Sequence, residues 1–441
     1  MDIPWALELA ERLGAEVESM QLLAGGASKE AWAVHAGGER VLVRRAAGGV
    51  IHEATLPLEQ EFEVLRAAEE AGVKVPHPVA YLGELGGREA FAMERVEGET
   101  IGRRIVRNPP PGLDVQLAEE LAKIHAIPPG RLPFLTGGDI LARFEGELDS
   151  VGEPHPAIEY GLAWLRERAP EPLPSVVLHG DFRLGNVVVS ERGLVALLDW
   201  EFAHLGDPTE DVAWPIVRAW RFGRDDLRLG GIGEVEPYLE RYVELTGREI
   251  AVEDLLWWEV LGNLKWAVGS LTQSRRHLNG LERSVELAVL GRLAAEKEYE
   301  LLDLIEAPRR RLRRRRQDVR ALPARPSETT GRPVQGSSGH AVDRPDAGEL
   351  LEAVLEFLAT EVLPNATDQR QKFRTLVAMN ALGIARRELE SAEETLSADE
   401  LRELAARIRA GDVPDNALPL LKEHVAAKLR VANPDYLRLY G

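Results

Sequence analysis

The chain has 441 residues, a hydrophobic fraction of 44% and a formal net charge of -19. This length predicts two or three domains with sizeable cores, and the acidic balance argues against general binding to nucleic acid or to an anionic membrane. There is no cysteine, which excludes disulfides, thiolate metal sites and cysteine nucleophiles.

The N-terminal segment MDIPWALELAERLG is acidic and amphipathic, whereas a secretory leader begins basic and continues apolar. No apolar stretch reaches the ~18 to 20 residues that a membrane span needs. We therefore expect a cytoplasmic protein with neither a membrane nor a nucleic-acid partner.

Residues 1–98 have the pattern of a small β-rich lobe. Strand-like runs lie around Gln21 to Val34 and Val41 to Arg44, with a Gly-Gly-Ala-Ser turn inside the first and a glycine hairpin between the two. An apolar stripe in PLEQEFEVLRAAEEAG predicts a helix that Gly72 ends. A further strand, turn and strand close the lobe at Gly98.

The pattern from residue 99 to 307 is mostly helical. Residues 308–345 combine an arginine run with Pro, Ser and Gly, a composition that cannot bury enough surface to fold and therefore predicts a linker. Helical periodicity resumes over residues 346–441, where we expect a small all-helical domain. The fold class expected is α+β and bilobal, with an extra helical domain at the C-terminal end.

A polar loop interrupts the helical region. In VVLHGDFRLGNVVV, the octet HGDFRLGN stands between two valine runs that are typical of buried strands. The octet is therefore displayed at the end of a sheet, where loops commonly carry chemistry. It contains His179, Asp181, Arg183 and Asn186.

The next segment, NVVVSERGLVALLDWE, predicts a hairpin. A turn centred between Arg192 and Gly193 would pair Val187 with Leu198 and Asn186 with Asp199, at the open end beside Asp181. Carboxylate and amide oxygens suit Mg²⁺ holding a polyphosphate. One acid can instead orient an attacking hydroxyl and accept its proton, so this constellation predicts phosphoryl transfer.

Residues 20 to 300 resemble the aminoglycoside phosphotransferase and choline kinase group, whose members are relatives of the protein kinases. The HGDxxxxN spacing and LLDWE carry the resemblance. It implies a protein-kinase-like fold that uses ATP and Mg²⁺, with Asp181 as the catalytic base and Asn186 and Asp199 as metal ligands. Arg183 stands where protein kinases usually carry a lysine near the transferred group, and either stabilises that group or pairs with an acid to hold the loop.

The resemblance also implies a nucleotide site. LLAGGASKEAWAV is similar to the family's glycine-rich loop, and FAMERVEG to its interlobe hinge, with the Glu94 carbonyl and the Val96 amide on adenine. Glu61 stands where the family's helix glutamate pairs with a phosphate-binding lysine. The backbone over the phosphates would come from four consecutive residues: Gly25, Gly26, Ala27 and Ser28.

The lysine position of the family is occupied by Arg44 in this chain. Arginine keeps the charge, but its planar fork is longer and wider than an ammonium. Arginine here, with HGDFRLGN and LLDWEFAHLGDPTEDVAW, most resembles the kinase-like part fused to some acyl-CoA dehydrogenases. That resemblance implies a hydroxyacyl-type acceptor.

The leading hypothesis is thus an ATP- and Mg-dependent kinase that phosphorylates a hydroxyl group on a small molecule. One alternative is a nucleotide-binding pseudokinase, motivated by Arg44, whose C-terminal helical domain recruits a protein partner. A second alternative is an antibiotic-modifying phosphotransferase. Mg-ATP turnover separates the first two hypotheses, and a resistance assay tests the third.

Overall fold

The computed structural model describes residues 3–23, 29–47, 55–317, 347–391 and 396–440, with side chains described except over 308–317. The chain divides into two compact units, which we describe separately. The first comprises residues 1–143 and 168–262, and the second comprises residues 144–167 and 263–441. No helix within the described ranges is long and apolar enough to cross a membrane.

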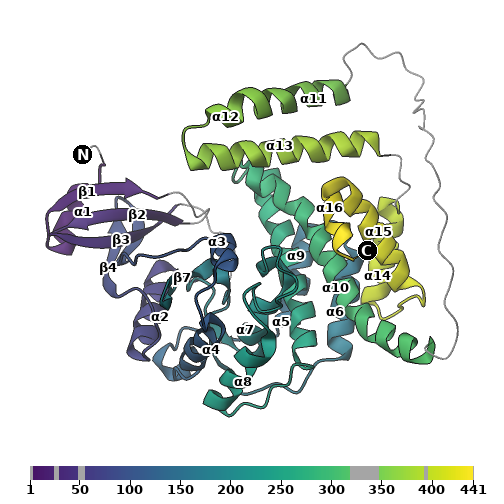
Figure 1. The fold of residues 1–441 in the computed structure, drawn as a ribbon, viewed down its shortest axis with the longest axis horizontal. Coiled ribbons are helices and arrows are strands. Elements are labelled where there is room, and N and C mark those ends of the chain that lie inside the picture. Colours follow the sequence, from purple (N-terminus) through teal and green to yellow (C-terminus); the bar gives the residue numbers. More distant parts are fainter. Residues whose placement is uncertain (1–2, 24–28, 48–54, 318–346, 392–395, 441) are drawn as a thin grey trace. The chain divides into compact units, whose positions relative to one another are not determined.

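The first unit begins with a five-stranded antiparallel sheet of order β1-β2-β3-β5-β4 (Figure 1). Its strands confirm the predicted β-rich lobe and comprise β1 (Val17–Leu22), β2 (Lys29–Ala36), β3 (Glu39–Ala46), β4 (Pro78–Leu85) and β5 (Arg88–Glu94). Because side chains alternate along a strand, each strand presents residues to both faces.

Helix α1 (Ala6–Leu13) covers one face of this sheet, where Trp5 and Leu9 join a core that includes Val43. Helix α2 (Leu58–Glu70) packs on β4 and β5, with the rings of Phe62 and Phe91 5.6 Å apart. The carboxylate of Glu89 in β5 accepts hydrogen bonds from the first backbone N–H groups of α2. This side-chain cap fixes where α2 begins.

The rest of the first unit is mainly helical, as predicted. Two short antiparallel strand pairs flank the polar loop: β6 (Val176–Leu178) with β9 (His204–Gly206), and the hairpin of β7 (Val187–Ser190) with β8 (Gly193–Leu197). The helices of this part are α3 (Gly102–Arg107), α4 (Leu113–Ile124), α7 (Thr209–Ala213) and α8 (Val235–Thr246). Helices α5 (Ile140–Val151) and α9 (Leu255–Leu278) contribute residues to both units.

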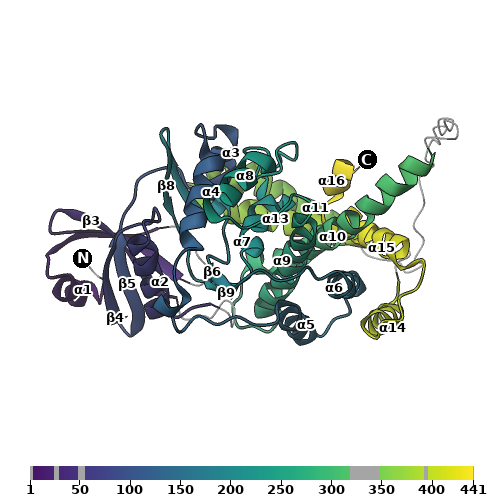
Figure 2. The same cartoon turned by 90° about the horizontal axis from the view of Figure 1, so that it is seen from below.

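The second unit is all helical. It contains α6 (Pro156–Glu167), α10 (Val285–Gln317), α11 (Ala347–Phe357), α12 (Leu363–Asn365), α13 (Gln369–Glu390), α14 (Ala398–Arg409), α15 (Ala417–Ala432) and α16 (Pro434–Leu437). Helix α14 lies along α6, and α15 packs on α10 (Figure 2). The C-terminal helices therefore share a compact unit with helices that precede the predicted linker.

Two features differ from the predicted domain limits. Helix α10 continues to Gln317, ten residues into the segment 308–345 that composition assigns to a linker. The helices after that linker also do not form a separate domain, because Arg409 of α14 contacts Glu159 of α6, with Nε and Oε2 3.1 Å apart, and Asp149 of α5. Composition identifies residues that cannot form a core, but it does not show which distant helices bury each other's faces.

A buried carboxylate joins three segments of this unit. Glu298 of α10 is fully buried; it accepts a hydrogen bond from Nδ1 of His155, 2.7 Å away, and pairs with Lys428 of α15. Burial would raise the pKa of Glu298, but the charge of Lys428 and the hydrogen bond from His155 outweigh burial and place this pKa well below its ordinary value.

We predict that Glu298→Gln lowers the free energy of unfolding of the second unit by about 3 kcal/mol at pH 7, because Lys428 loses the buried carboxylate with which it pairs. A carboxylate with a depressed folded-state pKa stabilises the fold above its unfolded pKa and loses this effect as the pH falls. The difference from wild type should therefore narrow below pH 4.5, the unperturbed value.

Urea denaturation at several pH values measures this difference. The matched control is Glu423→Gln, because Glu423 pairs with Arg430 at the exposed surface of the same unit, where ion pairs contribute little. Equal stability of Glu298→Gln and wild type at pH 7 would contradict the assignment.

Candidate functional site

The polar loop is anchored by a buried aspartate that the sequence did not point to. Asp211 of α7 is fully buried, and its carboxylate accepts hydrogen bonds from the backbone N–H groups of His179 (2.6 Å) and Gly180 (3.0 Å). His125 also lies against it, with Nε2 3.4 Å from Oδ2. The segment DPTED shows three acids near a helix start, but nothing in it distinguishes the one that turns inward.

His179 and Gly180 fix the conformation of the polar loop. His179 is buried, and its Nε2 lies 3.0 Å from the carbonyl oxygen of Leu198. Gly180 has a φ of +79°, and an added Cβ would lie 2.2 Å from the carbonyl oxygen of Phe202. Only glycine fits this left-handed position and this close approach.

Asp181 follows this anchor, and three donors orient its carboxylate. Nδ2 of Asn186 lies 2.6 Å from Oδ2, and Nε1 of Trp214 lies 2.7 Å from Oδ1. Nε of Arg183 contacts both oxygens, at 2.9 and 3.1 Å, and its guanidinium carbon lies 4.4 Å from the ring centre of Trp220. The structure thus brings together the loop residues that the sequence singled out and adds Trp214, for which the sequence offered no signal.

The hairpin forms, but the predicted register is wrong. The turn centres one residue earlier than predicted, because Ser190 pairs with Gly193, and this error alone would shift the pairing by two residues. A bulge between Val188 and Val189 reduces the shift to one residue, so that Val187 pairs with Leu197 and not with Leu198. The N–H of Leu198 still donates to the carbonyl of Asn186, 2.8 Å away. Asn186 and Asp199 therefore both remain at the open end.

Asp199 has an unusual backbone, with a φ of +68°. Non-glycine residues adopt this region at a cost and are enriched at functional sites. Burial would raise the pKa of Asp199, but the charge of Arg44, whose NH2 lies 2.9 Å from Oδ1, outweighs burial and lowers it. The ionised carboxylate is the form that binds a metal.

The donor set at this end suits Mg²⁺. Asn186 and Asp199 provide hard oxygens, and Nδ2 of Asn186 is already bound to Asp181, which leaves the amide oxygen as the ligand atom. Among the described residues, no three His, Asp or Glu side chains group so that they could hold a metal. A metal here would therefore need further ligands, such as nucleotide phosphates.

Charged residues from the sheet and from α2 meet this end of the hairpin. Glu61 is 2% exposed, and its Oε1 lies 3.4 Å from NH2 of Arg44. A second cation, which sequence reasoning missed, lies closer: Nζ of Lys29 is 2.5 Å from Oε2 of Glu61 and 2.8 Å from Oε2 of Glu201. Burial and the charge of Asp199 raise the pKa of Glu201. The sequence did offer one indication of this role, because Lys29 directly follows the glycine turn.

The remaining predicted nucleotide residues are only partly described. Gly25, Gly26, Ala27 and Ser28 lie outside the described residues. Glu94 ends β5, and its N–H donates to the carbonyl of His77. Val96 follows in the connection to α3. Their contacts with a nucleotide remain predictions.

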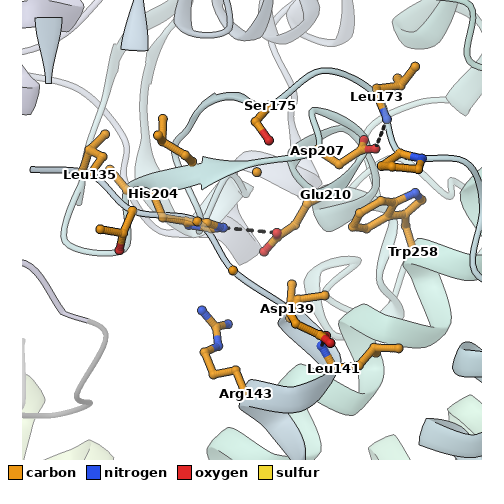
Figure 3. A pocket seen from close by; sticks show the side chains of 18 of the residues that line it. Leu135, Asp139, Leu141, Arg143, Leu173, Ser175, His204, Asp207, Glu210 and Trp258 are labelled. Atoms are coloured by element: carbon orange, nitrogen blue, oxygen red, sulfur yellow. Dashed lines mark hydrogen bonds and ion pairs between the residues drawn. The ribbon is translucent and has the colours of Figure 1, made fainter. Parts of the chain in front are cut away.

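A large cavity, with a volume of about 840 Å³, is lined by the whole of β9 and by residues that precede β6 (Figure 3). Its lining includes Leu173 and Ser175, which precede β6, whereas Asp181 follows this strand. His204 points toward Glu210, with Nε2 and Oε2 3.2 Å apart. Asp207 accepts hydrogen bonds from the N–H groups of Leu173 and of Thr209, the first residue of α7.

Comparison with known proteins agrees with this geometry. A family model described as "Phosphotransferase enzyme family" matches residues 19–249, and one described as a domain of unknown function (DUF6285) matches residues 365–436. Acyl-CoA dehydrogenase family member 10 of Mus musculus is 27% identical over 253 residues, which are 49% of this chain and 23% of that protein. Acyl-CoA dehydrogenase family member 11 of Gallus gallus is 25% identical over 320 residues, covering 64% of this chain and 40% of that protein. The chain thus spans less than half the length of either relative.

Solved structures share the fold. A Ralstonia eutropha JMP134 protein, described as a candidate aminoglycoside phosphotransferase, superposes with a TM-score of 0.54 at 21% identity, covering 66% of this chain and 95% of that one. The GDP and kanamycin complex of APH(2")-IIia superposes with a TM-score of 0.50 at 15% identity, covering 66% and 97%. The kinase-like fold predicted from the sequence is therefore confirmed. Because the matched residues 19–249 are more than half of the chain and contain the loop and hairpin described above, the chain belongs to the phosphotransferase enzyme family.

Proposed function

We propose that this protein is an ATP- and Mg-dependent kinase that transfers the γ-phosphoryl group to a hydroxyl group of a small molecule. The observation that supports this most directly is the arrangement around Asp181. Its carboxylate is held by Asn186, Trp214 and Arg183 beside the open hairpin end that carries Asp199. Phosphoryl transfer needs mainly positioning and charge stabilisation, and this site supplies both.

In this proposal Asp181 accepts the proton of the acceptor hydroxyl while that oxygen forms a bond to the γ-phosphorus and the bond to the ADP oxygen breaks. Asn186 and Asp199 would hold Mg²⁺, which neutralises the phosphate charge when bound. Residues 1–98 act as the nucleotide-binding lobe and residues 99–307 as the catalytic lobe. Gly25 to Ser28 cover the phosphates, and Glu94 and Val96 bind adenine.

For the acceptor we propose a hydroxyacyl-type compound. The support is the similarity to two proteins named for the acyl-CoA dehydrogenase family. A screen of hydroxyacyl-CoA, hydroxy acid, sugar and amino-alcohol acceptors for ADP release tests this assignment. Release only with an aminoglycoside or macrolide would favour the antibiotic-modifying alternative.

A second candidate is a nucleotide-binding scaffold without turnover. It is favoured by Arg44 in the lysine position and by its 2.9 Å ion pair with Asp199. Exposed apolar side chains on α11, namely Leu350, Val354 and Phe357, would serve such a scaffold by contacting a protein partner. Nucleotide binding without ADP release from any acceptor would support this candidate over the kinase.

We predict that Asp181→Asn keeps the fold and nucleotide affinity but lowers turnover by about 10² to 10⁴, because it removes the proton acceptor without changing shape. Steady-state kinetics on the identified acceptor and calorimetry with Mg-ATP measure the two quantities. Near wild-type turnover in this variant would show that another group is the base.

Asp199→Ala and Asn186→Ala should shift the Mg²⁺ dependence of ATP binding, with the larger shift for Asp199 because it carries a full charge. A Mg²⁺ titration of ATP affinity measures both shifts. The control is Asp207→Asn, which alters a helix cap and not the hairpin end. If neither variant changes the Mg²⁺ titration, Asn186 and Asp199 are not the metal ligands.

Arg183 is proposed as a second catalytic residue that stabilises the moving phosphoryl group. Under this role Arg183→Ala lowers kcat with ATP affinity and melting temperature unchanged, and Arg183→Lys recovers part of the rate. Its contacts with Asp181 and Trp220 support the alternative of a loop brace. If Arg183 only braces the loop, Arg183→Ala instead lowers the melting temperature and the nucleotide affinity together.

A further inference from the structure

Two cations, not one, contact the carboxylates of Glu61, Asp199 and Glu201. Arg44 lies 2.9 Å from Asp199 and 3.4 Å from Glu61. Lys29 lies 2.5 Å from Glu61 and 2.8 Å from Glu201, and its side chain is only 11% exposed. Glu61 of α2 therefore forms its shorter ion pair with Lys29 of β2 and its longer one with Arg44 of β3. In the family, the phosphate-binding cation stands at the position of Arg44.

The register of the sheet explains how Lys29 reaches this place. Ala31 of β2 pairs with Arg44, and Lys29 pairs with Ala46. Directly opposed residues of an antiparallel pair share a face, and so do residues two apart on one strand. Lys29 and Arg44 are therefore diagonal neighbours on one face. Because both directly opposed residues are alanines, neither long side chain is blocked by its partner.

The two cations pair with different carboxylates, so they can serve different functions. Arg44 is the counter-ion of Asp199, the proposed metal ligand, and its planar fork suits a carboxylate. Lys29 is held by Glu61 and Glu201, neither of which is a proposed metal ligand. An ammonium is a compact point charge on a flexible stem, and it can contact a phosphate oxygen while one carboxylate keeps its position.

We propose that Lys29 supplies the ammonium that binds the nucleotide phosphates, and that Arg44 serves as the counter-ion of Asp199. This inference rests on the proposed kinase function. It assigns to β2 the role that the sequence comparison placed on β3, so that arginine at position 44 is compatible with turnover. Glu61 then positions Lys29, in the way that a helix glutamate positions a phosphate-binding cation.

The test compares the affinities for Mg-ATP and for adenosine, which lacks phosphates, in the full-length protein. We expect Lys29→Met to raise the Kd of Mg-ATP by about tenfold or more, the effect of losing one charge-assisted hydrogen bond. The Kd of adenosine should stay unchanged, and Lys29→Arg should recover part of the ATP affinity. Lys123→Met is the matched control, because Lys123 pairs with Glu120 on α4, in the helical part of the same unit.

Three results would overturn the assignment. If Lys29 only braces α2 against the sheet, Lys29→Met weakens ATP and adenosine binding together and lowers the melting temperature. If Arg44 is the phosphate cation, Arg44→Met raises the Kd of Mg-ATP while Lys29→Met leaves it unchanged, and the kinase proposal stands. If the wild-type protein binds no nucleotide, the kinase proposal fails as well.

Discussion

The site depends on one buried carboxylate. Asp211 is fully buried, and burying an ionised group is costly unless hydrogen bonds compensate for the lost water. Here the compensation comes from the backbone N–H groups of His179 and Gly180, with His125 alongside. The backbone of the loop is therefore fixed by the same hydrogen bonds that make Asp211 tolerable in the core. Asp181 follows directly, so its position is set before any ligand arrives.

Around this fixed loop, the carboxylate of Asp181 is oriented by groups that come from different parts of the chain. Asn186 belongs to the short 3-10 turn before β7, whereas Trp214 follows α7. Both donate to Asp181, one to each oxygen. Fixing both oxygens determines the direction in which the carboxylate presents its remaining lone pairs. Such preorganisation reduces the reorganisation that a reaction would otherwise require.

Local patterns predicted much of this architecture. The valine runs around the octet indicated strands, and the polar residues between them indicated a displayed loop, because both signals are contained in a few consecutive residues. The bulge at Val188 was not predictable, since it changes the register without changing the residue pattern. Lys29 and Trp214 were missed because their roles arise from partners far away in the sequence, Glu61 and Asp181.

The C-terminal region shows the same limit on a larger scale. Its helical periodicity was visible, and its helices form. The sequence did not indicate which surface these helices pack on. Arg409 of α14 pairs with Glu159 of α6, which lies on the other side of the predicted linker in the chain. Periodicity indicates that a helix has a face to bury, but it does not identify the surface that covers it.

This ion pair also has a consequence for synthesis of the protein. Glu159 and Arg409 are 250 residues apart in the chain. At about 5 to 20 residues per second, a ribosome needs roughly 12 to 50 s to reach Arg409 after it has made α6. During that interval the surface of α6 that α14 later covers has no native partner. The second unit can therefore be completed only after α14 has been made, and a nascent chain that stalls in the segment before α14 would present an unfinished helical surface to chaperones and proteases.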